Sequence, residues 1–467
     1  MTEPVPYRSR ADRMVTTGRR FRDFLDRLAA ASPARLAILS FVGVILVFIV
    51  LLCLPVSHRN PEDWHFATIV FVAVSAVCVT GLTPVNTEEY WSDFGVSVIT
   101  AGIQVGGLGI LTLASLLGMA ASGKLGVRQK LIAAQATNTY NVGQVGTLLR
   151  TVVYTVLIAE GVIASLLFPR FLMRGEEFGD ALWYSVFYAI SGFNNAGFAI
   201  HPGGMEYFAD DPWIISVIMV AVFVGALGFP CVLVMSLSWR TPSKWDLHTK
   251  LTLATSGILV AVGAFLLYFF EGSNPRTLGD KGFGQTVLET LFLAVMPRSG
   301  GFNTMDVAEM NQTTHLVTDV LMFIGGGSSS TGGGIKVTTL AVLVLAAYAE
   351  ARGFTDVTAF RRRIDPGVVK IAVSVTLAGF FIVIAGTLAV LQATRMPLDL
   401  VLFEVISAFG TSGLSSGVSA AANTPALFIL SFLMLLGRLG TITLAAALSN
   451  QNTRRFYRYP EERPIIG

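Results

Sequence analysis

One short pattern recurs four times along the chain, and it constrains the fold more than any other feature. Each copy is a tetrapeptide with glycine at its third position, and each follows a short apolar run. The copies are Val79-Thr80-Gly81-Leu82, Asn195-Ala196-Gly197-Phe198, Ser299-Gly300-Gly301-Phe302 and Thr411-Ser412-Gly413-Leu414. Because the glycines recur at spacings of 116, 104 and 112 residues, the sequence predicts a repeat architecture. Four copies predict four pseudo-symmetric units around one axis, where glycine lets another group approach the backbone closely.

The residues upstream of each glycine also repeat. An apolar residue lies ten positions before all four glycines, and a serine lies six positions before three of them. The serines are Ser75, Ser191 and Ser407, whereas the third copy carries Val295 at this place. The repeated element is therefore the apolar run together with its tetrapeptide.

Composition places these repeats in a membrane. Only 13% of the residues are charged and 53% are hydrophobic, whereas a soluble protein carries about 25% charged residues. Most of eight longer apolar runs reach the roughly 20 residues that span a bilayer core. The runs lie near residues 35–57, 94–121, 147–169, 213–239, 249–270, 317–348, 368–392 and 424–449. We predict an all-α integral membrane protein with eight transmembrane helices.

The apolar runs that end at the tetrapeptides are too short to cross a bilayer, which is typical of re-entrant segments. Non-helical backbone at membrane depth is tolerated where it lines water or is buried in protein. Each unit is therefore predicted to contain a span, a re-entrant pore helix, a tetrapeptide and a second span around one central pore. The predicted organisation is an N-terminal arm at 1–33, pore units at 34–122, 145–240, 247–349 and 367–449, and a C-terminal tail at 450–467.

The distribution of basic residues predicts the orientation. Basic residues fall in the N-terminal arm, in alternate connections and in the tail, among them Arg19, Lys124, Arg240, Arg361 and Arg454. The other connections lean acidic. By the positive-inside rule, both termini are predicted to be cytoplasmic. The alternation also argues against nucleic-acid binding by these clusters.

The tetrapeptides carry no acidic side chain, so backbone carbonyls are the simplest ligands they offer. Four extended residues cover about 13 Å, which is less than half of a hydrocarbon core of about 30 Å. Each re-entrant helix ends at its tetrapeptide, so its negative dipole end faces the axis and favours a cation. A short constriction of carbonyls predicts a dehydrated alkali cation, K⁺ before Na⁺. The alternative is a set of four packing glycines in an ordinary transporter.

A Gly/Ser-rich stretch interrupts the sixth apolar run. It comprises Gly325, Gly326, Gly327, Ser328, Ser329, Ser330, Thr331, Gly332, Gly333 and Gly334, followed by Ile335 and Lys336. Six glycines do not hold a stable helix, since each costs up to about 1 kcal/mol relative to alanine. We interpret the stretch as an intramembrane gating loop; a passive kink is the alternative. A phosphate-binding loop requires Gly-Lys-Ser/Thr, which this order lacks.

Arg438 lies in the middle of the last span, where a charge is costly and usually functional. The corresponding places in the other units hold small residues, so Arg438 is the bulky cation at that level. The alternative is a buried structural contact with Glu160 or with a loop carbonyl. Glu160, Glu289 and Glu404 also lie in apolar runs and are predicted to hydrogen-bond within the protein, with a proton relay as the alternative.

Together these segments resemble the Trk/Ktr/HKT superfamily of K⁺ transporters, most like its KtrB-type membrane subunits, from about residue 35 onward. The resemblance implies a selectivity filter centred on Gly81, Gly197, Gly301 and Gly413. In plant HKT members a serine at the first position accompanies Na⁺ transport, so Gly81 points to K⁺. The resemblance also implies that residues 325–334 gate the pore and that Arg438 forms a barrier beneath the filter.

The same resemblance implies two partners. One is a second copy of the chain, in a homodimer with the tail at 461–467 near the contact. The other is a cytoplasmic RCK-type nucleotide-binding regulatory subunit (KtrA-like) docked on the basic loops. The predicted function is gated K⁺ uptake across the cytoplasmic membrane, and whether Na⁺ is also transported is left open. No enzyme activity and no organic cofactor are predicted. The rivals are a Na⁺-coupled secondary carrier with a midplane site and a non-transporting receptor.

Overall fold

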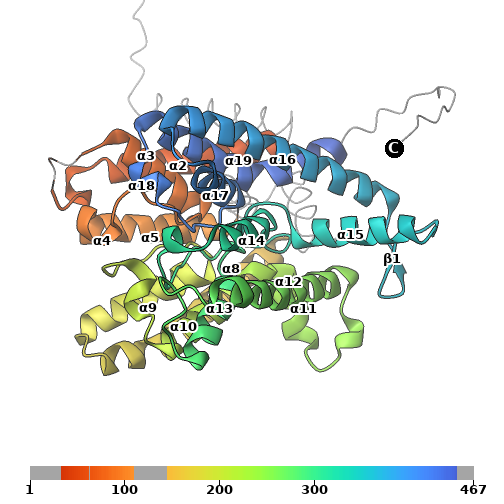
Figure 1. The fold of residues 1–467 in the computed structure, drawn as a ribbon, viewed down its shortest axis with the longest axis horizontal. Coiled ribbons are helices and arrows are strands. Elements are labelled where there is room, and N and C mark those ends of the chain that lie inside the picture. Colours follow the sequence, from red (N-terminus) through yellow and green to blue (C-terminus); the bar gives the residue numbers. More distant parts are fainter. Residues whose placement is uncertain (1–32, 61, 63, 110–144, 450–467) are drawn as a thin grey trace, which may run out of the picture.

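The computed structural model describes residues 33–60, 62, 64–109 and 145–449, and these are largely helical (Figure 1). Residues 1–32 of the predicted N-terminal arm, the predicted C-terminal tail at 450–467 and the basic connection that contains Lys124 lie outside the described residues. The second predicted span leaves the described part of the chain after Gly109.

The helices follow one another in a repeating order of long, short and long. The first group contains α2 (Pro33–Leu52), α3 (Phe66–Cys78) and α5 (Asp93–Gly107), and the second contains α8 (Val145–Met173), α9 (Phe178–Phe193), α10 (Pro212–Leu227) and α11 (Phe229–Ser238). The third contains α12 (Leu247–Glu271), α13 (Phe283–Val295), α14 (Gln312–Phe323) and α15 (Val337–Ala351), and the fourth contains α16 (Pro366–Thr394), α17 (Leu398–Gly410) and α19 (Thr424–Ser449).

Short elements join these helices. They are η1 (Pro55–Ser57), α4 (Thr87–Tyr90), η4 (Gly204–Phe208), η5 (Pro242–Lys244), η6 (Val307–Glu309) and α18 (Val418–Ala421). A small antiparallel hairpin of β1 (Thr358–Ala359) and β2 (Arg362–Arg363) pairs Thr358 with Arg363.

The short helices α3, α9, α13 and α17 form the centre of the molecule. Helix α3 packs against α2, α5 and α19, and α17 packs against α14, α16 and α19. Helix α9 contacts α8, α10 and α5, while α13 contacts α12 and α10. Almost every residue in the second half of each short helix is buried. Their C-terminal ends are thereby held inside the helical shell.

The fourth predicted span consists of two helices rather than one. Helices α10 and α11 meet at an angle of 101°. Gly228, between them, has a φ of 91°, and a Cβ placed on it would lie 2.6 Å from the carbonyl oxygen of Ser328. Pro230 follows in the first turn of α11. The Gly/Ser-rich segment packs into this bend, and hydropathy alone does not reveal such a contact.

The sixth predicted span is broken where the sequence suggests. Helix α14 ends at Phe323 and α15 begins at Val337. Ile324 and Ile335 pair in a parallel bridge, which closes residues 325–334 into a loop with adjacent ends. We call this segment the Gly/Ser loop.

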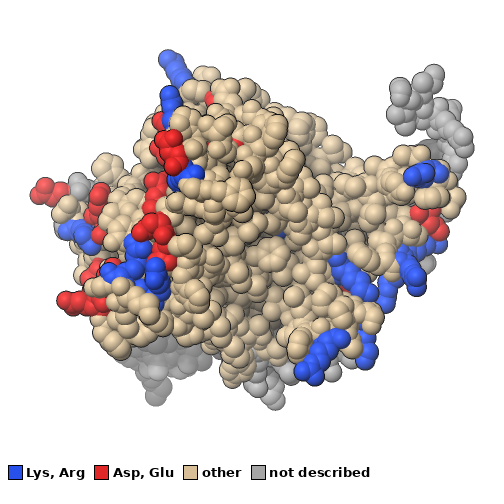
Figure 2. All heavy atoms as spheres, turned by 60° about the horizontal axis from the view of Figure 1, so that its bottom comes forward, with Lys and Arg blue, Asp and Glu red and all other residues tan. Residues whose placement is uncertain are grey.

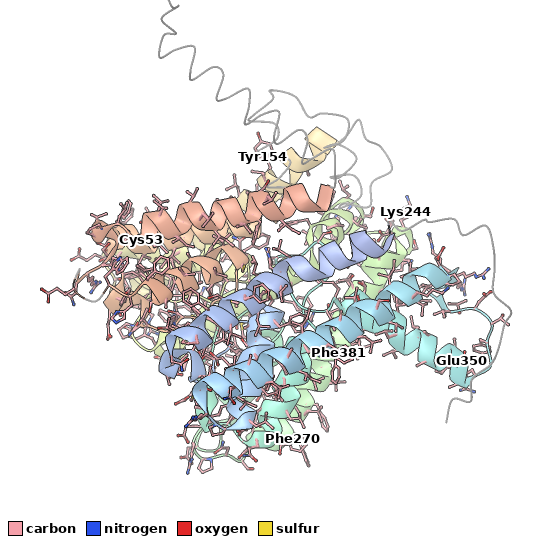
Figure 3. All side chains as sticks on the ribbon, turned by 90° about the horizontal axis from the view of Figure 1, so that it is seen from above. Cys53, Tyr154, Lys244, Phe270, Glu350 and Phe381 are labelled. Atoms are coloured by element: carbon pink, nitrogen blue, oxygen red, sulfur yellow. The ribbon has the colours of Figure 1, made fainter. Side chains whose placement is uncertain are left out.

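Three described helices are long and apolar enough to cross a membrane: Thr151–Met173, Leu247–Glu271 and Pro366–Thr394. The bent pair α10–α11 passes the same test as one span. Apolar side chains cover their outer faces; Tyr154 of α8 and Phe381 of α16 point away from the molecule and are 64% and 65% exposed (Figure 3). Together these features describe a multi-pass, all-α membrane protein.

Charged side chains gather in two groups separated by a broad uncharged band (Figure 2). The group over the end that carries α11, η5 and the β1–β2 hairpin is mostly basic. The band between the groups is the surface expected in contact with lipid.

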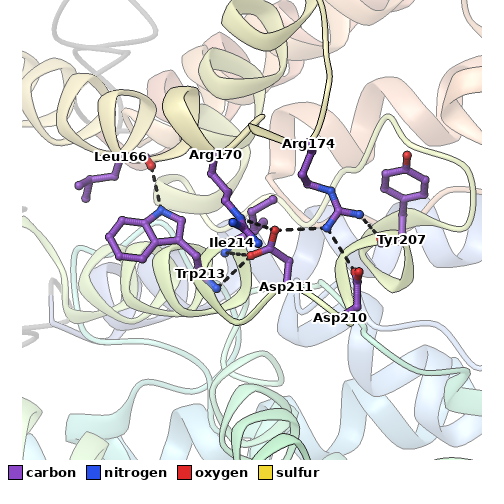
Figure 4. Close-up of polar contacts among 8 residues, drawn as sticks. All are labelled: Leu166, Arg170, Arg174, Tyr207, Asp210, Asp211, Trp213 and Ile214. Atoms are coloured by element: carbon purple, nitrogen blue, oxygen red, sulfur yellow. Dashed lines mark hydrogen bonds and ion pairs between the residues drawn. The ribbon is translucent and has the colours of Figure 1, made fainter. Parts of the chain in front are cut away.

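A charged cluster fixes the end of α8 to the start of α10 (Figure 4). Asp211 accepts hydrogen bonds from Arg170 Nε at 2.7 Å and Arg174 Nη1 at 3.2 Å, and it also caps α10 through the backbone N–H of Trp213. Burial by itself raises the pKa of Asp211, but these hydrogen bonds outweigh it and lower the pKa below its usual value. The cluster anchors the connection that follows the second tetrapeptide.

Candidate functional site

The four predicted tetrapeptides meet at one place in the interior. A Cβ on Gly197 would lie 2.7 Å from the Cα of Gly301, and a Cβ on Gly301 would lie 3.1 Å from the Cα of Gly413. A Cβ on Gly81 would overlap the backbone of Ala196. All four glycines have positive φ, between 69° and 93°. Space and backbone conformation therefore both require glycine.

Four backbone carbonyls face these glycines in cyclic order. The oxygen of Ala196 faces Gly81, that of Gly300 faces Gly197, that of Ser412 faces Gly301 and that of Thr80 faces Gly413. In each copy, the carbonyl belongs to the residue directly before the glycine. We call the oxygens of residues 80, 196, 300 and 412 the carbonyl ring.

The first residue of each tetrapeptide has a left-handed backbone conformation. Val79, Asn195, Ser299 and Thr411 have φ values of 56°, 59°, 84° and 46°. This conformation is uncommon for any residue other than glycine, and it is strained for a β-branched one. The same strain in all four copies indicates that the site, rather than local propensity, sets the backbone.

The electrostatics of the ring favour a cation. Helices α3 and α17 end directly before their tetrapeptides, α9 ends two residues before and α13 ends a few residues before. Their negative dipole ends therefore point toward the ring. Among the described residues, no group of three or more His, Cys, Asp or Glu is arranged to hold a metal ion. Backbone oxygens are the ligands that this site offers.

The repeated serines hold three of the tetrapeptides. The hydroxyl oxygens of Ser75 and Ser407 accept hydrogen bonds from the backbone N–H groups of Gly81 and Gly413, both at 3.1 Å. Ser191 acts differently, because its hydroxyl donates to the carbonyl of Phe198 at 2.8 Å. The serine repeat thus reflects support of the backbone from inside each short helix.

The third tetrapeptide is held in another way. Helix α13 ends at Val295, and the backbone N–H groups of Gly300 and Gly301 both donate to the carbonyl of Met296, at 2.7 and 3.4 Å. Helix α13 therefore ends farther from its ring glycine than α3, α9 and α17 end from theirs, so a serine at 295 would not occupy the same place.

Arg298, next to this tetrapeptide, was not among the predicted site residues. It is 1% exposed, and its guanidinium donates to the carbonyl and the hydroxyl of Ser256 on α12, at 3.2 and 2.8 Å. Within the described part of the chain it forms no ion pair. The sequence signal was an arginine between an apolar run and a tetrapeptide.

A cavity of about 270 Å³ opens on the C-terminal side of the tetrapeptides. Its polar lining includes Asn86, His201, Asn303 and Ser415. The His201 Nδ1 atom lies 2.8 Å from the hydroxyl of Tyr188. Burial, with a smaller contribution from the charge of Arg174, lowers the pKa of His201 to about 4. The imidazole is therefore neutral at physiological pH, and it adds no charge to the cavity.

The Gly/Ser loop lies on the opposite side of the tetrapeptides. Lys336 donates to the carbonyls of Gly332 and Gly333, at 2.5 and 3.4 Å. The Lys336 ammonium is thus bonded to the loop's own carbonyls, which does not match a phosphate-binding loop. The predicted loop residues and the carbonyl ring are brought together.

Arg438 is 5% exposed and joins this assembly. Its guanidinium donates to the carbonyl of Thr331 and, at 2.7 Å, to the carbonyl of Gly106 at the end of α5. Of the two structural partners considered from sequence, the loop carbonyl is present. Glu160 instead accepts from Gln104 and Asn194, at 3.2 and 2.8 Å.

The other two buried acids also hydrogen-bond within the protein, as expected. Glu289 accepts from Lys281 at 2.6 Å and from Gln285 at 3.0 Å. Glu404 accepts from Ser415, Ser416 and Ser419, which follow the fourth tetrapeptide. Both acids therefore anchor the short helices, and they leave the carbonyl ring free of carboxylates.

Comparison with known proteins gives matches over almost the whole chain. Residues 36–455 match the TrkH family of cation transport proteins. The chain is 34% identical to "Ktr system potassium uptake protein B" of Bacillus subtilis, over 96% of this chain and 99% of that protein. It is 34% identical to the protein of the same name in Vibrio alginolyticus, over 95% and 96% of the two chains.

Two further matches concern ion type and fold. The chain is 32% identical to "Potassium/sodium uptake protein NtpJ" of Enterococcus hirae, over 93% of this chain and 97% of that protein. The crystal structure of the potassium transporter TrkH from Vibrio parahaemolyticus superposes with a TM-score of 0.68 at 20% identity, covering 89% of this chain and 85% of that one. The structural match concerns the fold.

Proposed function

Because the chain belongs to the TrkH family of cation transport proteins, and is therefore a transporter and not an enzyme, we propose that it takes up K⁺ through the carbonyl ring. The observation that carries this proposal is the cyclic arrangement of the oxygens of residues 80, 196, 300 and 412 around four glycines. Carbonyl oxygens replace the hydration shell of an alkali cation in filters of this kind. The Ktr relatives are named for potassium uptake, which supports the same ion.

The proposed architecture has four pore units, at 34–122, 145–240, 247–349 and 367–449. In each unit a re-entrant helix, α3, α9, α13 or α17, delivers one tetrapeptide to the axis. The basic group of side chains in Figure 2 then faces the cytoplasm, in accord with the positive-inside rule. Eight spans follow if the bent α10–α11 pair and the broken α14–α15 pair each count as one.

The Gly/Ser loop and Arg438 form the proposed gate. Both lie on the N-terminal side of the tetrapeptides. An ion that enters from the cavity and passes the carbonyl ring must leave on this side. Shortening residues 325–334 should raise ion flux and weaken its control, because the obstruction is removed. Unchanged flux and unchanged control in the shortened protein would contradict a gating role.

Partners of two kinds complete the proposal: a second copy of the chain and a cytoplasmic RCK-type nucleotide-binding subunit on the basic face. The chain's Ktr relatives belong to named "systems", which supports a multi-component transporter. Co-purification of the full chain with an RCK-type subunit, against a variant with Arg361–Arg363 changed to glutamine, tests the docking.

Na⁺ is the second candidate ion, because one relative is named for potassium and sodium uptake. A Na⁺-coupled carrier with an enclosed midplane site is less favoured by a ring of four equivalent carbonyls. Rb⁺ uptake that needs Na⁺ in fixed proportion would support the carrier.

Rb⁺ uptake and K⁺-limited growth of cells that lack K⁺ importers test the main proposal, with Gly81→Ser and Gly413→Ser as variants. Each serine would be strained at a φ near 90° and would overlap the carbonyl ring, so both should lose K⁺ preference. Gly257→Ser on α12, where nothing lies within 4 Å, is the matched control. Full K⁺ preference in both filter variants would refute the ring.

A further inference from the structure

The Gly/Ser loop touches the tetrapeptides through Ser299 and Thr411. The backbone N–H of Gly333 donates to Thr411 Oγ1 at 2.8 Å, and Ser299 Oγ donates to the carbonyl oxygen of Thr411 at 2.7 Å. Both side chains are fully buried. Both residues hold the left-handed position that opens their tetrapeptides. A segment proposed to move is therefore bonded directly to a segment proposed to select ions.

Glycine is needed in the loop for this contact to form. A Cβ on Gly332 would lie 2.9 Å from Ser299 Cβ, and a Cβ on Gly333 would lie 2.5 Å from Thr411 Oγ1. Both distances are shorter than real side-chain contacts. The two glycines thus serve a close approach to the tetrapeptides, beyond any need for flexibility.

One peptide group connects Lys336 to the filter. In the peptide between Gly332 and Gly333, the carbonyl accepts from the Lys336 ammonium and the N–H donates to Thr411. A hydrogen bond to the carbonyl polarises the peptide and strengthens its N–H as a donor. Arg438 holds the preceding carbonyl, that of Thr331. This peptide group therefore links the position of the loop to the Thr411 hydroxyl.

We propose that Thr411 couples the loop to ion selection. While the loop is in place, the N–H of Gly333 occupies a lone pair of Thr411 Oγ1 and fixes the side chain. When the loop moves away, the hydroxyl is released to act as a ligand for the passing cation. Displacement of the loop then changes the preference between K⁺ and Na⁺ as well as the rate. This inference rests on the proposed function and adds a specificity-determining residue to it.

The first tetrapeptide supplies the variant that tests this coupling. Val79 occupies the position equivalent to Thr411, with a similar φ of 56° against 46°. Valine is therefore accommodated at this backbone position, and Thr411→Val removes the hydroxyl while keeping the shape. Thr411→Ser keeps the hydroxyl. Thr376→Val on α16 is the matched control, because the Thr376 hydroxyl has no hydrogen-bond partner among the described residues and lies outside the tetrapeptides.

The experiment measures Rb⁺ influx into liposomes that contain the full chain, and the Na⁺ concentration that halves it. Each variant is made in the intact chain and in a chain without residues 328–330. Removing these residues should shift the half-inhibiting Na⁺ concentration about fivefold in wild type, Thr411→Ser and Thr376→Val. Fivefold is the factor that one hydrogen bond of about 1 kcal/mol supplies. In Thr411→Val the shift should be less than about twofold.

Lys336→Met provides a second route that leaves the tetrapeptides intact. It should reproduce part of the shift caused by loop removal, and it should have no such effect in the Thr411→Val background. Equal shifts with and without the Thr411 hydroxyl would overturn the coupling and leave the proposed function standing. Absence of Rb⁺ influx in wild type would overturn both.

Discussion

The third tetrapeptide and the other three reach the same ring by different supports. In the first and fourth copies, Ser75 and Ser407 accept the N–H of the ring glycine from within the preceding helix. In the third copy the carbonyl of Met296 takes that role, and Arg298 fastens the segment to α12. The geometry of the ring is repeated, whereas the contacts that produce it are not. A repeat in sequence therefore identifies the ring more reliably than its supports.

The largest expected effect comes from Arg298→Met. Burying a charge without an ionic partner is costly, so its retention indicates a role in holding the third tetrapeptide. We expect Rb⁺ uptake to fall more than about tenfold and K⁺ preference to weaken, without a fall in the melting temperature. Arg298→Lys should recover part of the activity, because one of the two bonds to Ser256 can re-form.

Arg276→Met is the matched control for this variant. Arg276 is exposed and pairs with Glu309 at the surface, where an ion pair contributes about 0–1 kcal/mol. Its uptake should match wild type. Wild-type uptake and selectivity in Arg298→Met would show that the third tetrapeptide needs no anchor.

Ser75→Ala and Ser407→Ala should have the next largest effects. Each leaves a buried backbone N–H without a partner, which costs about 1–3 kcal/mol. We expect a lower melting temperature and a several-fold loss of K⁺ preference in Rb⁺ uptake with Na⁺ competition. Ser374→Ala on the outer face of α16 removes a hydroxyl bonded only to its own helix and should change neither quantity. If neither Ser75→Ala nor Ser407→Ala changes the melting temperature or the K⁺ preference, the support assigned to these serines is contradicted.

Val295→Ser should have a small effect, although it restores the repeated serine. The N–H groups of Gly300 and Gly301 already donate to Met296, so the new hydroxyl gains no ring glycine as a partner. Uptake and selectivity within about twofold of wild type are expected. A clear gain in K⁺ preference would mean that the third copy is supported like the first and fourth after all.

The smallest expected effect is on the pH dependence of the protein's stability. It involves His201, which lies in the connection after the second tetrapeptide. The unfolded chain binds the histidine proton below about pH 6.5, while the folded protein binds it only near pH 4. The resulting stability is complete above pH 6.5 and is lost as the pH falls toward 4. The melting temperature should therefore fall over this range in wild type and less steeply in His201→Gln. A melting temperature that falls equally steeply with pH in wild type and in His201→Gln would exclude a contribution of His201 to stability.

The sequence predicted the elements that are repeated or compositionally unusual. It singled out the four tetrapeptides, the short helices before them, the Gly/Ser loop and Arg438, because glycine runs and isolated charges stand out in an apolar chain. The bend at Gly228 was missed, since a continuous apolar run hides a break that a distant loop stabilises. Arg298 was missed because its partner, Ser256, lies on another helix. The left-handed residues that open the tetrapeptides were missed as well, because a ring imposed by packing overrides local preference.

The most direct test of the account is a structure of the full protein in Rb⁺, with anomalous scattering used to locate the ion. The account predicts a peak on the axis between the carbonyl oxygens of residues 80, 196, 300 and 412, and its loss in Gly413→Ser. Rb⁺ bound only elsewhere, or an empty ring at a Rb⁺ concentration that supports uptake, would contradict it.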